Sequence, residues 1–174
     1  MRPVLIVPGY MNSGPGHWQS LLEASLSAKR AEMPNWAFPR KAQWVEALDE
    51  AIRQFQGEAP ILVAHSLGCI AVAHWARSSS QEVAGALLVA PTDVERTDVL
   101  EAVRGFAPIP KSQLPFPSMV VASDDDPYVS ELRARDLARW WGSRFHLLHG
   151  AGHINQESGF GPWPAGEGLL QELR

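Results

Sequence analysis

Short apolar runs alternate along the chain with longer stretches in which apolar and polar residues mix. The runs are rich in Val, Ile and Leu. Strands that are buried on both faces of a parallel sheet have this uninterrupted apolar pattern. We therefore predict strands at Val4–Val7, Ile61–Ala64, Ala86–Val89, Met119–Ala122 and Phe145–Leu148, and a weaker strand near Ala31–Met33.

The longer stretches repeat their apolar residues with a period close to that of a helix, which is typical of helices that cover a core. In one of them, Trp44, Leu48 and Ile52 fall on the same face. The same reasoning predicts helices at Trp18–Ala28, Ala42–Phe55, Ile70–Arg77, Ser130–Trp141 and Ala165–Leu173.

Strands that alternate with helices build a parallel sheet covered on both faces. We therefore expect a three-layer α/β/α sandwich with a mostly parallel sheet of about six strands. Because no repeat, linker or low-complexity tract interrupts the pattern, we expect a single domain over residues 1–174.

One segment breaks the alternation. The predicted strands that end at Val89 and begin at Met119 are separated by 29 residues, five of them proline. We expect one helix over residues 93–104 and an ordered loop over the rest. Loops of this length often form lids or pocket walls, so this one is a candidate for either.

Composition and charge narrow the function classes. The chain is 45% hydrophobic and 20% charged, with a net charge of −4. It therefore lacks the basic footprint of a nucleic-acid-binding protein or of a protein that binds anionic membranes. The apolar run at Val4–Val7 is too short for a signal sequence or a membrane span, and Cys69 is the only cysteine. We expect a cytoplasmic protein without disulfides or a thiolate metal cluster.

A candidate nucleophile lies where the second clear strand passes into a helix. The sequence there is Ala64-His65-Ser66-Leu67-Gly68. It resembles the G-x-S-x-G nucleophile elbow of α/β-hydrolases, with alanine at the first glycine position. Residues two before and two after the serine must be small, because strand and helix approach each other closely at this turn. The motif alone does not distinguish a catalytic serine from an ordinary turn.

A serine nucleophile needs a base, and the base needs a carboxylate that orients it. In this fold class the acid and the histidine each follow a later strand. Asp126 follows the strand at Met119–Ala122, and Pro127 holds it in an extended conformation. We expect Asp126 to be the acid and its neighbours Asp124 and Asp125 to be turn residues or helix caps, with Asp93 as a lesser rival.

Of the six histidines, only His153 stands in a glycine-flanked loop after the last predicted strand. It is free there to reach over the edge of the sheet, so we predict the triad Ser66, Asp126 and His153. The other histidines lie next to the nucleophile, on a helix, along a strand or in the first loop, namely His65, His74, His146, His149 and His17.

Acyl transfer also needs two donors for the tetrahedral oxyanion. The backbone N–H of Leu67, directly after the serine, is one candidate. The first strand is followed by Pro8-Gly9-Tyr10, which makes the Tyr10 N–H the second. The same loop lacks the spacing of a phosphate-binding loop. We expect no cofactor, and no metal, because the Asp run lacks further ligands nearby.

Aromatic residues suggest how a substrate pocket is built. Phe160 and Trp163 follow His153 in a loop-like segment. With Trp18, Tyr128, Tyr10 and the loop at 105–117, they are expected to wall a small apolar acyl pocket.

These motifs together resemble the small serine hydrolases related to retinoblastoma-binding protein nine. The shared features are Val7-Pro8-Gly9, His65-Ser66-x-Gly68, Ser123-x-x-Asp126-Pro127-Tyr128 and Gly152-His153. The resemblance spans nearly the whole chain. It implies a compact α/β-hydrolase without the first two strands of larger relatives, with six strands, little or no cap, and the same triad.

Activity on small activated esters is what this resemblance implies. The motif L-x-C-x-E is missing, because Ala71 stands where Glu is required after Cys69. No retinoblastoma-type partner is therefore expected.

The sequence thus predicts an esterase-like serine hydrolase that forms an acyl-enzyme on Ser66 with a small-molecule acyl substrate. Thioesterase, amidase and haloperoxidase-like activities remain alternatives on the same fold. A catalytically weak protein-binding module on a hydrolase scaffold is a further alternative. Dehalogenases are disfavoured because they use an aspartate where this chain has Ser66.

Overall fold

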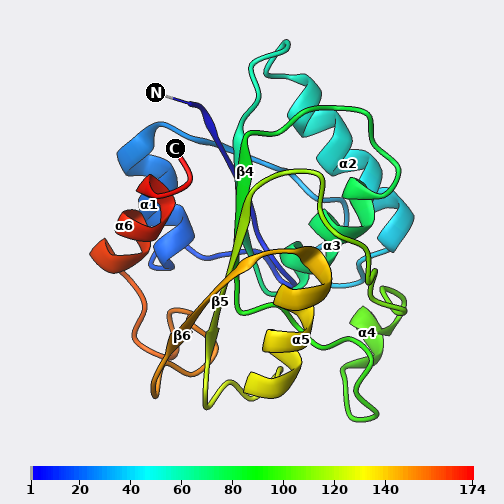
Figure 1. The fold of residues 1–174 in the computed structure, drawn as a ribbon, viewed down its shortest axis with the longest axis vertical. Coiled ribbons are helices and arrows are strands. Elements are labelled where there is room, and N and C mark those ends of the chain that lie inside the picture. The colour runs from blue at the N-terminus through cyan, green and yellow to red at the C-terminus, as the bar shows by residue number, and fades with distance from the viewer. Residues whose placement is uncertain (1) are drawn as a thin grey trace.

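A six-stranded, fully parallel sheet forms the middle layer of the protein (Figure 1). The computed structural model describes residues 2–174. The strand order is β2-β1-β3-β4-β5-β6. The bounds are β1 Val4–Val7, β2 Lys29–Arg30, β3 Ile61–His65, β4 Gly85–Val89, β5 Ser118–Ser123 and β6 Arg144–Leu148. The apolar runs thus mark the five longer strands to within one or two residues, because most of them are buried on both faces.

Helices cover both faces of the sheet. Figure 1 shows α1 and α6 on one side and α2, α3 and α5 on the other. The bounds are α1 Trp18–Leu26, α2 Lys41–Arg53, α3 Leu67–Ala76, α4 Glu101–Arg104, α5 Glu131–Trp141 and α6 Pro164–Gln171. Each side has its own core, one around Trp44, Trp75 and Trp141 and the other around Trp18 and Leu170. The predicted three-layer α/β/α fold is confirmed.

The edge strand lies two residues earlier than predicted. β2 covers only Lys29–Arg30, whereas the apolar pattern indicated Ala31–Met33. Ala31 still donates its N–H to Ile6 O at 2.9 Å, and the chain then leaves the sheet. Ala31 and Met33 are buried in the core, so their apolar character reflects packing rather than strand pairing.

The helix predicted over residues 93–104 is mostly absent. Only its last turn forms, as α4, and residues 93–100 make a series of turns. Asp93 accepts a hydrogen bond from the Glu95 N–H at 3.1 Å, and Arg96 pairs with Asp98 at 2.6 Å. Such local contacts from short polar side chains compete with helix hydrogen bonds, which explains the error.

Ser66 is the only residue between β3 and α3, so the turn is tighter than predicted and the helix begins at Leu67 rather than Ile70. Its backbone has φ 57° and ψ −125°, a conformation that residues other than glycine rarely adopt. The turn also lies against the end of β1. A Cβ on Gly68 would come within 2.4 Å of Val7 O and 2.7 Å of Pro8 O.

The part of the chain that the structure describes contains no helix that is both long enough and apolar enough to cross a bilayer.

The contact between Gly68 and β1 gives a stability prediction. Gly68→Ala forces backbone atoms apart, and we expect it to lower the free energy of unfolding by about 1–3 kcal/mol. Gly168→Ala is the matched control, because a Cβ there meets nothing within 4 Å inside α6. The control should be neutral or stabilise by up to about 1 kcal/mol. Urea denaturation measures both, and equal stability of the two variants would contradict the prediction.

Candidate active site

Three side chains from distant parts of the chain meet at the carboxyl end of the sheet. Ser66 follows β3, Asp126 follows β5 and His153 follows β6. His153 Nε2 lies 2.9 Å from Ser66 Oγ, and His153 Nδ1 lies 2.9 Å from Asp126 Oδ2. The structure therefore brings together the three residues that the sequence selected, in one unbroken line of hydrogen bonds.

Burial and a backbone contact fix the orientation of this line. The three residues are each 8% exposed. The Tyr128 N–H donates to Asp126 Oδ1 at 2.8 Å, which holds the carboxylate beside the imidazole. With the His153 Nδ1–H donating to Asp126, Nε2 is left to accept the Ser66 hydroxyl proton. This arrangement prepares the serine for proton transfer to the imidazole.

Asp124 and Asp125 shape the loop that carries His153. Asp124 accepts from the Gly150 N–H at 2.8 Å, and Asp125 accepts from the Gly152 N–H at 2.7 Å. The Gly150 contact, followed by His149, lowers the pKa of Asp124 below its usual value. The Ser123 hydroxyl, followed by the Gly152 N–H, does the same for the pKa of Asp125. Both act as turn residues.

Asp93, the rival acid, does not serve His153. Asp93 Oδ1 accepts a hydrogen bond from the Glu95 N–H, and Asp93 Oδ2 lies 3.3 Å from Arg133 Nε.

The two residues expected to supply oxyanion donors, Tyr10 and Leu67, both line the space in front of Ser66. Leu67 is the first residue of α3, so its N–H has no partner inside the helix. The loop after β1 contacts the same turn, since a Cβ on Gly9 would lie 2.8 Å from Ser66 Cβ and 3.1 Å from Leu67 N. Tyr10, the next residue, lines the cavity in front of Ser66 together with Leu67. The two predicted donors therefore border the same space.

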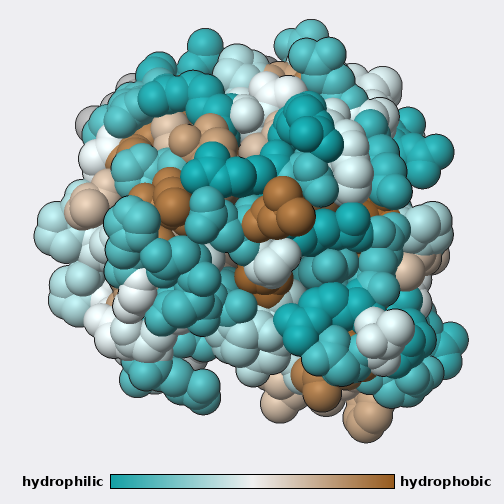
Figure 2. Space-filling view, turned by 60° about the horizontal axis from the view of Figure 1, so that its bottom comes forward, coloured by the Kyte–Doolittle hydropathy of each residue, from teal (hydrophilic) through white to brown (hydrophobic). Residues whose placement is uncertain are grey.

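The cavity in front of Ser66 has a volume of about 430 Å³. Tyr10 and Tyr128 line it as predicted, and His17, Asn155 and Glu157 complete one side. Another wall comes from the segment 92–103, with Val99, Leu100 and Val103 as its apolar members. Figure 2 shows this end of the molecule, where hydrophobic side chains form small groups separated by hydrophilic surface.

Three aromatic residues predicted to wall this cavity lie elsewhere. Trp18 and Trp163 pack edge to face with ring centroids 5.1 Å apart, and Phe160 packs against Trp163. Trp18 and Trp163 belong to the core beneath α1 and α6, and the partly buried Phe160 packs against it. The loop at 105–117 is also absent from the cavity, because Phe106, Ile109 and Leu114 are buried in the opposite core. The aromatic residues that follow His153 in the sequence therefore pack beneath α1 and α6 and do not line the cavity at Ser66.

Two histidines to which the sequence gave no role lie next to the site, His65 against His153 and His17 against His65. His65 Nε2 donates to the His153 carbonyl at 2.9 Å. Its ring also lies between those of His153 and His17, with centroid distances of 4.9 Å to each. Burial, with His153 and His17 nearby, lowers the pKa of His65 well below its usual value. A neutral His65 thus holds the backbone of the loop that presents His153.

His17 is also kept neutral. Its Nδ1 accepts from the Gln19 N–H at 3.1 Å, so the side chain caps α1. Burial, helped by Arg30 and His153, lowers the pKa of His17 from 6.5 to about 4. Protonation of Nδ1 would remove this cap and place a charge beside the site.

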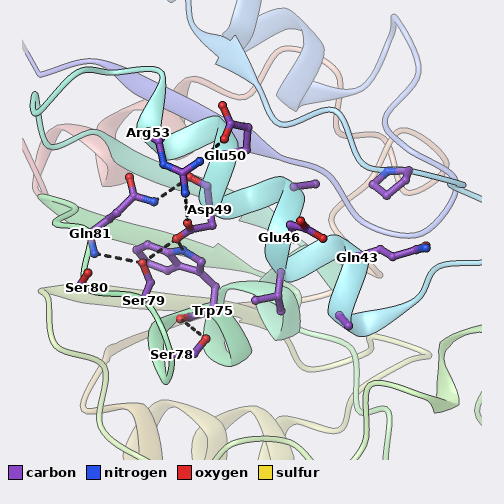
Figure 3. Close-up of a pocket in the computed structure, with 14 residues that line it drawn as sticks. Gln43, Glu46, Asp49, Glu50, Arg53, Trp75, Ser78, Ser79, Ser80 and Gln81 are labelled. Carbon is purple, nitrogen blue, oxygen red and sulfur yellow. Dashed lines mark hydrogen bonds and ion pairs between the residues drawn. The ribbon is translucent and has the colours of Figure 1, made fainter.

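A larger open hollow of about 870 Å³ lies between α2 and α3. Figure 3 shows that its polar side chains largely bind one another. Asp49 accepts from Trp75 Nε1 at 2.8 Å and from Ser79 Oγ at 2.7 Å, and it pairs with Arg53. No histidine lines this hollow, in contrast to the cavity at Ser66. Within residues 2–174, no cluster of His, Cys, Asp and Glu is arranged to hold a metal ion.

Comparisons with known proteins agree with this geometry. A family model described as serine hydrolase matches residues 4–172. A protein from Pectobacterium atrosepticum described as YdeN-like shares 32% identity and a TM-score of 0.86, over 99% of this chain and 90% of its own. The ydeN gene product of Bacillus subtilis shares 25% identity and a TM-score of 0.83, over 99% and 98%.

A thermophilic esterase from Thermogutta terrifontis has the same fold at 15% identity, with a TM-score of 0.72 over 100% of this chain and 90% of its own. None of the curated proteins compared with the chain matches it.

The depressed pKa of His17 predicts how stability depends on pH. Between about pH 6.5 and 4, the unfolded chain binds a proton at His17 that the folded chain does not, so stability falls as pH falls. We expect a loss on the order of 2 kcal/mol from this group between pH 7 and 4.5. His17→Asn keeps a capping oxygen and does not titrate. Urea denaturation across this range should therefore show a flatter curve for the variant, and parallel curves would contradict the prediction.

Proposed function

The chain belongs to the serine hydrolase family, and on that premise we propose that it cleaves small carboxylic esters through an acyl-enzyme on Ser66. The resemblance to small α/β-hydrolases that its motifs indicated is confirmed by the family match and the YdeN-like neighbours. The observation that carries the proposal is the hydrogen-bonded line from Ser66 Oγ through His153 to Asp126, with 2.9 Å at both links.

In the proposed reaction, Ser66 Oγ attacks the ester carbonyl carbon while its proton moves to His153 Nε2. The Tyr10 and Leu67 N–H groups bind the oxygen that becomes negative. His153 then gives its proton to the departing alcohol, and Asp126 stabilises the imidazolium in between. Water repeats the sequence on the acyl-enzyme, with His153 again first as base and then as acid.

The completeness of this set supports an enzyme over a binding module. Ser66, His153, Tyr10 and Leu67 border one cavity that is open to solvent, and Asp126 is hydrogen-bonded to His153. Ester substrates are supported by the fold neighbour from Thermogutta terrifontis, which is described as an esterase. The cavity volume of about 430 Å³ lies at the small end of ligand sites and favours small substrates. Val99, Leu100 and Val103 form its apolar wall, which we assign to the acyl group.

Variants of the three residues test the proposed role of each. Ser66→Ala and His153→Ala should lower the rate of p-nitrophenyl acetate hydrolysis by at least about a thousand-fold, and Asp126→Asn by a similar factor. His149→Ala is the control, because this exposed histidine lies in the same loop but pairs with Asp124. Its rate should stay within about three-fold of wild type. Unchanged hydrolysis by Ser66→Ala would overturn the proposal.

The apolar wall predicts how acyl length affects the rate. Leu100→Trp narrows the cavity, so octanoyl esters should lose about ten-fold in kcat/KM while acetyl esters change by less than about three-fold. Leu132→Trp makes the same change at an exposed leucine on α5 that does not line the cavity. A series of p-nitrophenyl esters measures both variants. The assignment of the wall fails if the two variants give the same dependence on acyl length.

A further inference from the structure

Ser66 has a second hydrogen-bonding partner besides His153. Its Oγ lies 2.8 Å from Thr92 Oγ1 and 2.9 Å from His153 Nε2. Thr92 is 7% exposed, and within residues 2–174 its hydroxyl has no other partner. The triad does not explain why a buried hydroxyl makes its one hydrogen bond within the described residues to Ser66 Oγ.

The direction of the hydrogen bonds follows from the count of protons. A serine hydroxyl donates one hydrogen bond and accepts up to two. Because the Nδ1–H of His153 donates to Asp126, Nε2 is an acceptor and takes the hydroxyl proton of Ser66. The contact with Thr92 is then one in which Thr92 donates and Ser66 Oγ accepts.

The backbone places Thr92 at this position through a costly conformation. Ala90, directly after β4, has φ 50°, a left-handed conformation that residues other than glycine disfavour. Its N–H donates to Val121 O at 2.8 Å, and two residues later Thr92 faces Ser66. The next residue, Asp93, donates its N–H to Tyr128 O at 3.1 Å. Strained backbone held by its surroundings is typical of functional sites.

We propose that Thr92 is a further catalytic residue, whose hydroxyl donates to Ser66 Oγ and stabilises the negative charge that this atom carries during the reaction. The proposal rests on the function proposed above. Thr92 keeps its own proton throughout and takes part in no proton transfer. Its position also directs the Ser66 hydroxyl proton toward His153 rather than toward solvent.

Charge develops on Ser66 Oγ twice. During attack, the Oγ–H bond breaks toward His153 Nε2 while the Oγ–carbon bond forms, and the carbonyl electron pair moves to the oxygen. During deacylation the Oγ–carbon bond breaks, its electron pair stays on Oγ, and His153 returns a proton to it. Thr92 lies against the same atom in both steps, so its loss should slow acylation and deacylation alike.

A reciprocal pair of variants separates the hydroxyl of Thr92 from its methyl group. Thr92→Val keeps the shape and loses the hydroxyl, whereas Thr92→Ser keeps the hydroxyl and loses the methyl. Thr97→Val, at the chain's exposed second threonine, is the matched control. For each variant, the rate of labelling by a fluorophosphonate and the kcat and KM for p-nitrophenyl acetate are measured, with Ser66→Ala as the blank.

We expect Thr92→Val to label about five- to ten-fold more slowly than wild type, the effect of losing one hydrogen bond. Its kcat should fall by a similar factor with KM nearly unchanged, because Thr92 acts on the reacting atom in acylation and deacylation alike. The labelling rate and kcat of Thr92→Ser should stay within about three-fold of those of wild type. The control Thr97→Val should have the wild-type values.

Three results would be decisive in the other direction. Wild-type rates for Thr92→Val, or a slower Thr92→Ser than Thr92→Val, would show that Thr92 acts through packing and would overturn the proposal. If Thr92→Val does not fold, by thermal denaturation, Thr92→Ala takes its place, and the same rates overturn the proposal. Wild-type labelling that survives Ser66→Ala would instead defeat the proposed function.

Discussion

The close approach of β1, β3 and α3 around Ser66 is the constraint on which the rest of the site depends. A turn of one residue, Ser66, can connect β3 to α3 because Gly68 has no side chain that would clash with Val7 O and Pro8 O. The same approach brings Gly9, and with it the Tyr10 segment, against the serine. The strained turn, the two backbone donors and the position of the nucleophile are therefore one packing arrangement.

Around this turn, the other functional groups are held mainly by backbone hydrogen bonds from side chains that do no chemistry themselves. Asp124 and Asp125 bind backbone N–H groups of the His153 loop, and His65 binds its carbonyl. Removing His65 would leave the buried His153 carbonyl without this partner, which is more destabilising than the loss of a surface contact. The loop that carries the proposed base is thus held by three hydrogen bonds, while the wall at residues 92–103 is made of turns and one short helix.

The fold and the meeting of Ser66, Asp126 and His153 could be predicted because both follow from local patterns. Buried strands are apolar runs, and the carboxyl ends of parallel strands lie at one edge, so residues that follow strands converge. The prediction of an aromatic acyl pocket was wrong, because Phe160 and Trp163, which follow His153 in the sequence, pack beneath α6 instead. Thr92 and His65 were missed because their contacts depend on side-chain directions. The position of Thr92 in the sequence did indicate the site, because Thr92 follows β4, which is the neighbour of the strand β3 that precedes Ser66.

The proposed role of Ser66 as nucleophile is tested most directly by mapping where a fluorophosphonate modifies the protein, by mass spectrometry after digestion. Ser66 Oγ is the proposed attacking atom, because within the described chain it alone is hydrogen-bonded to a base that a carboxylate orients. We expect one adduct for each protein molecule, on the peptide that contains Ser66. An adduct on another residue, or protein that stays unmodified, would contradict it.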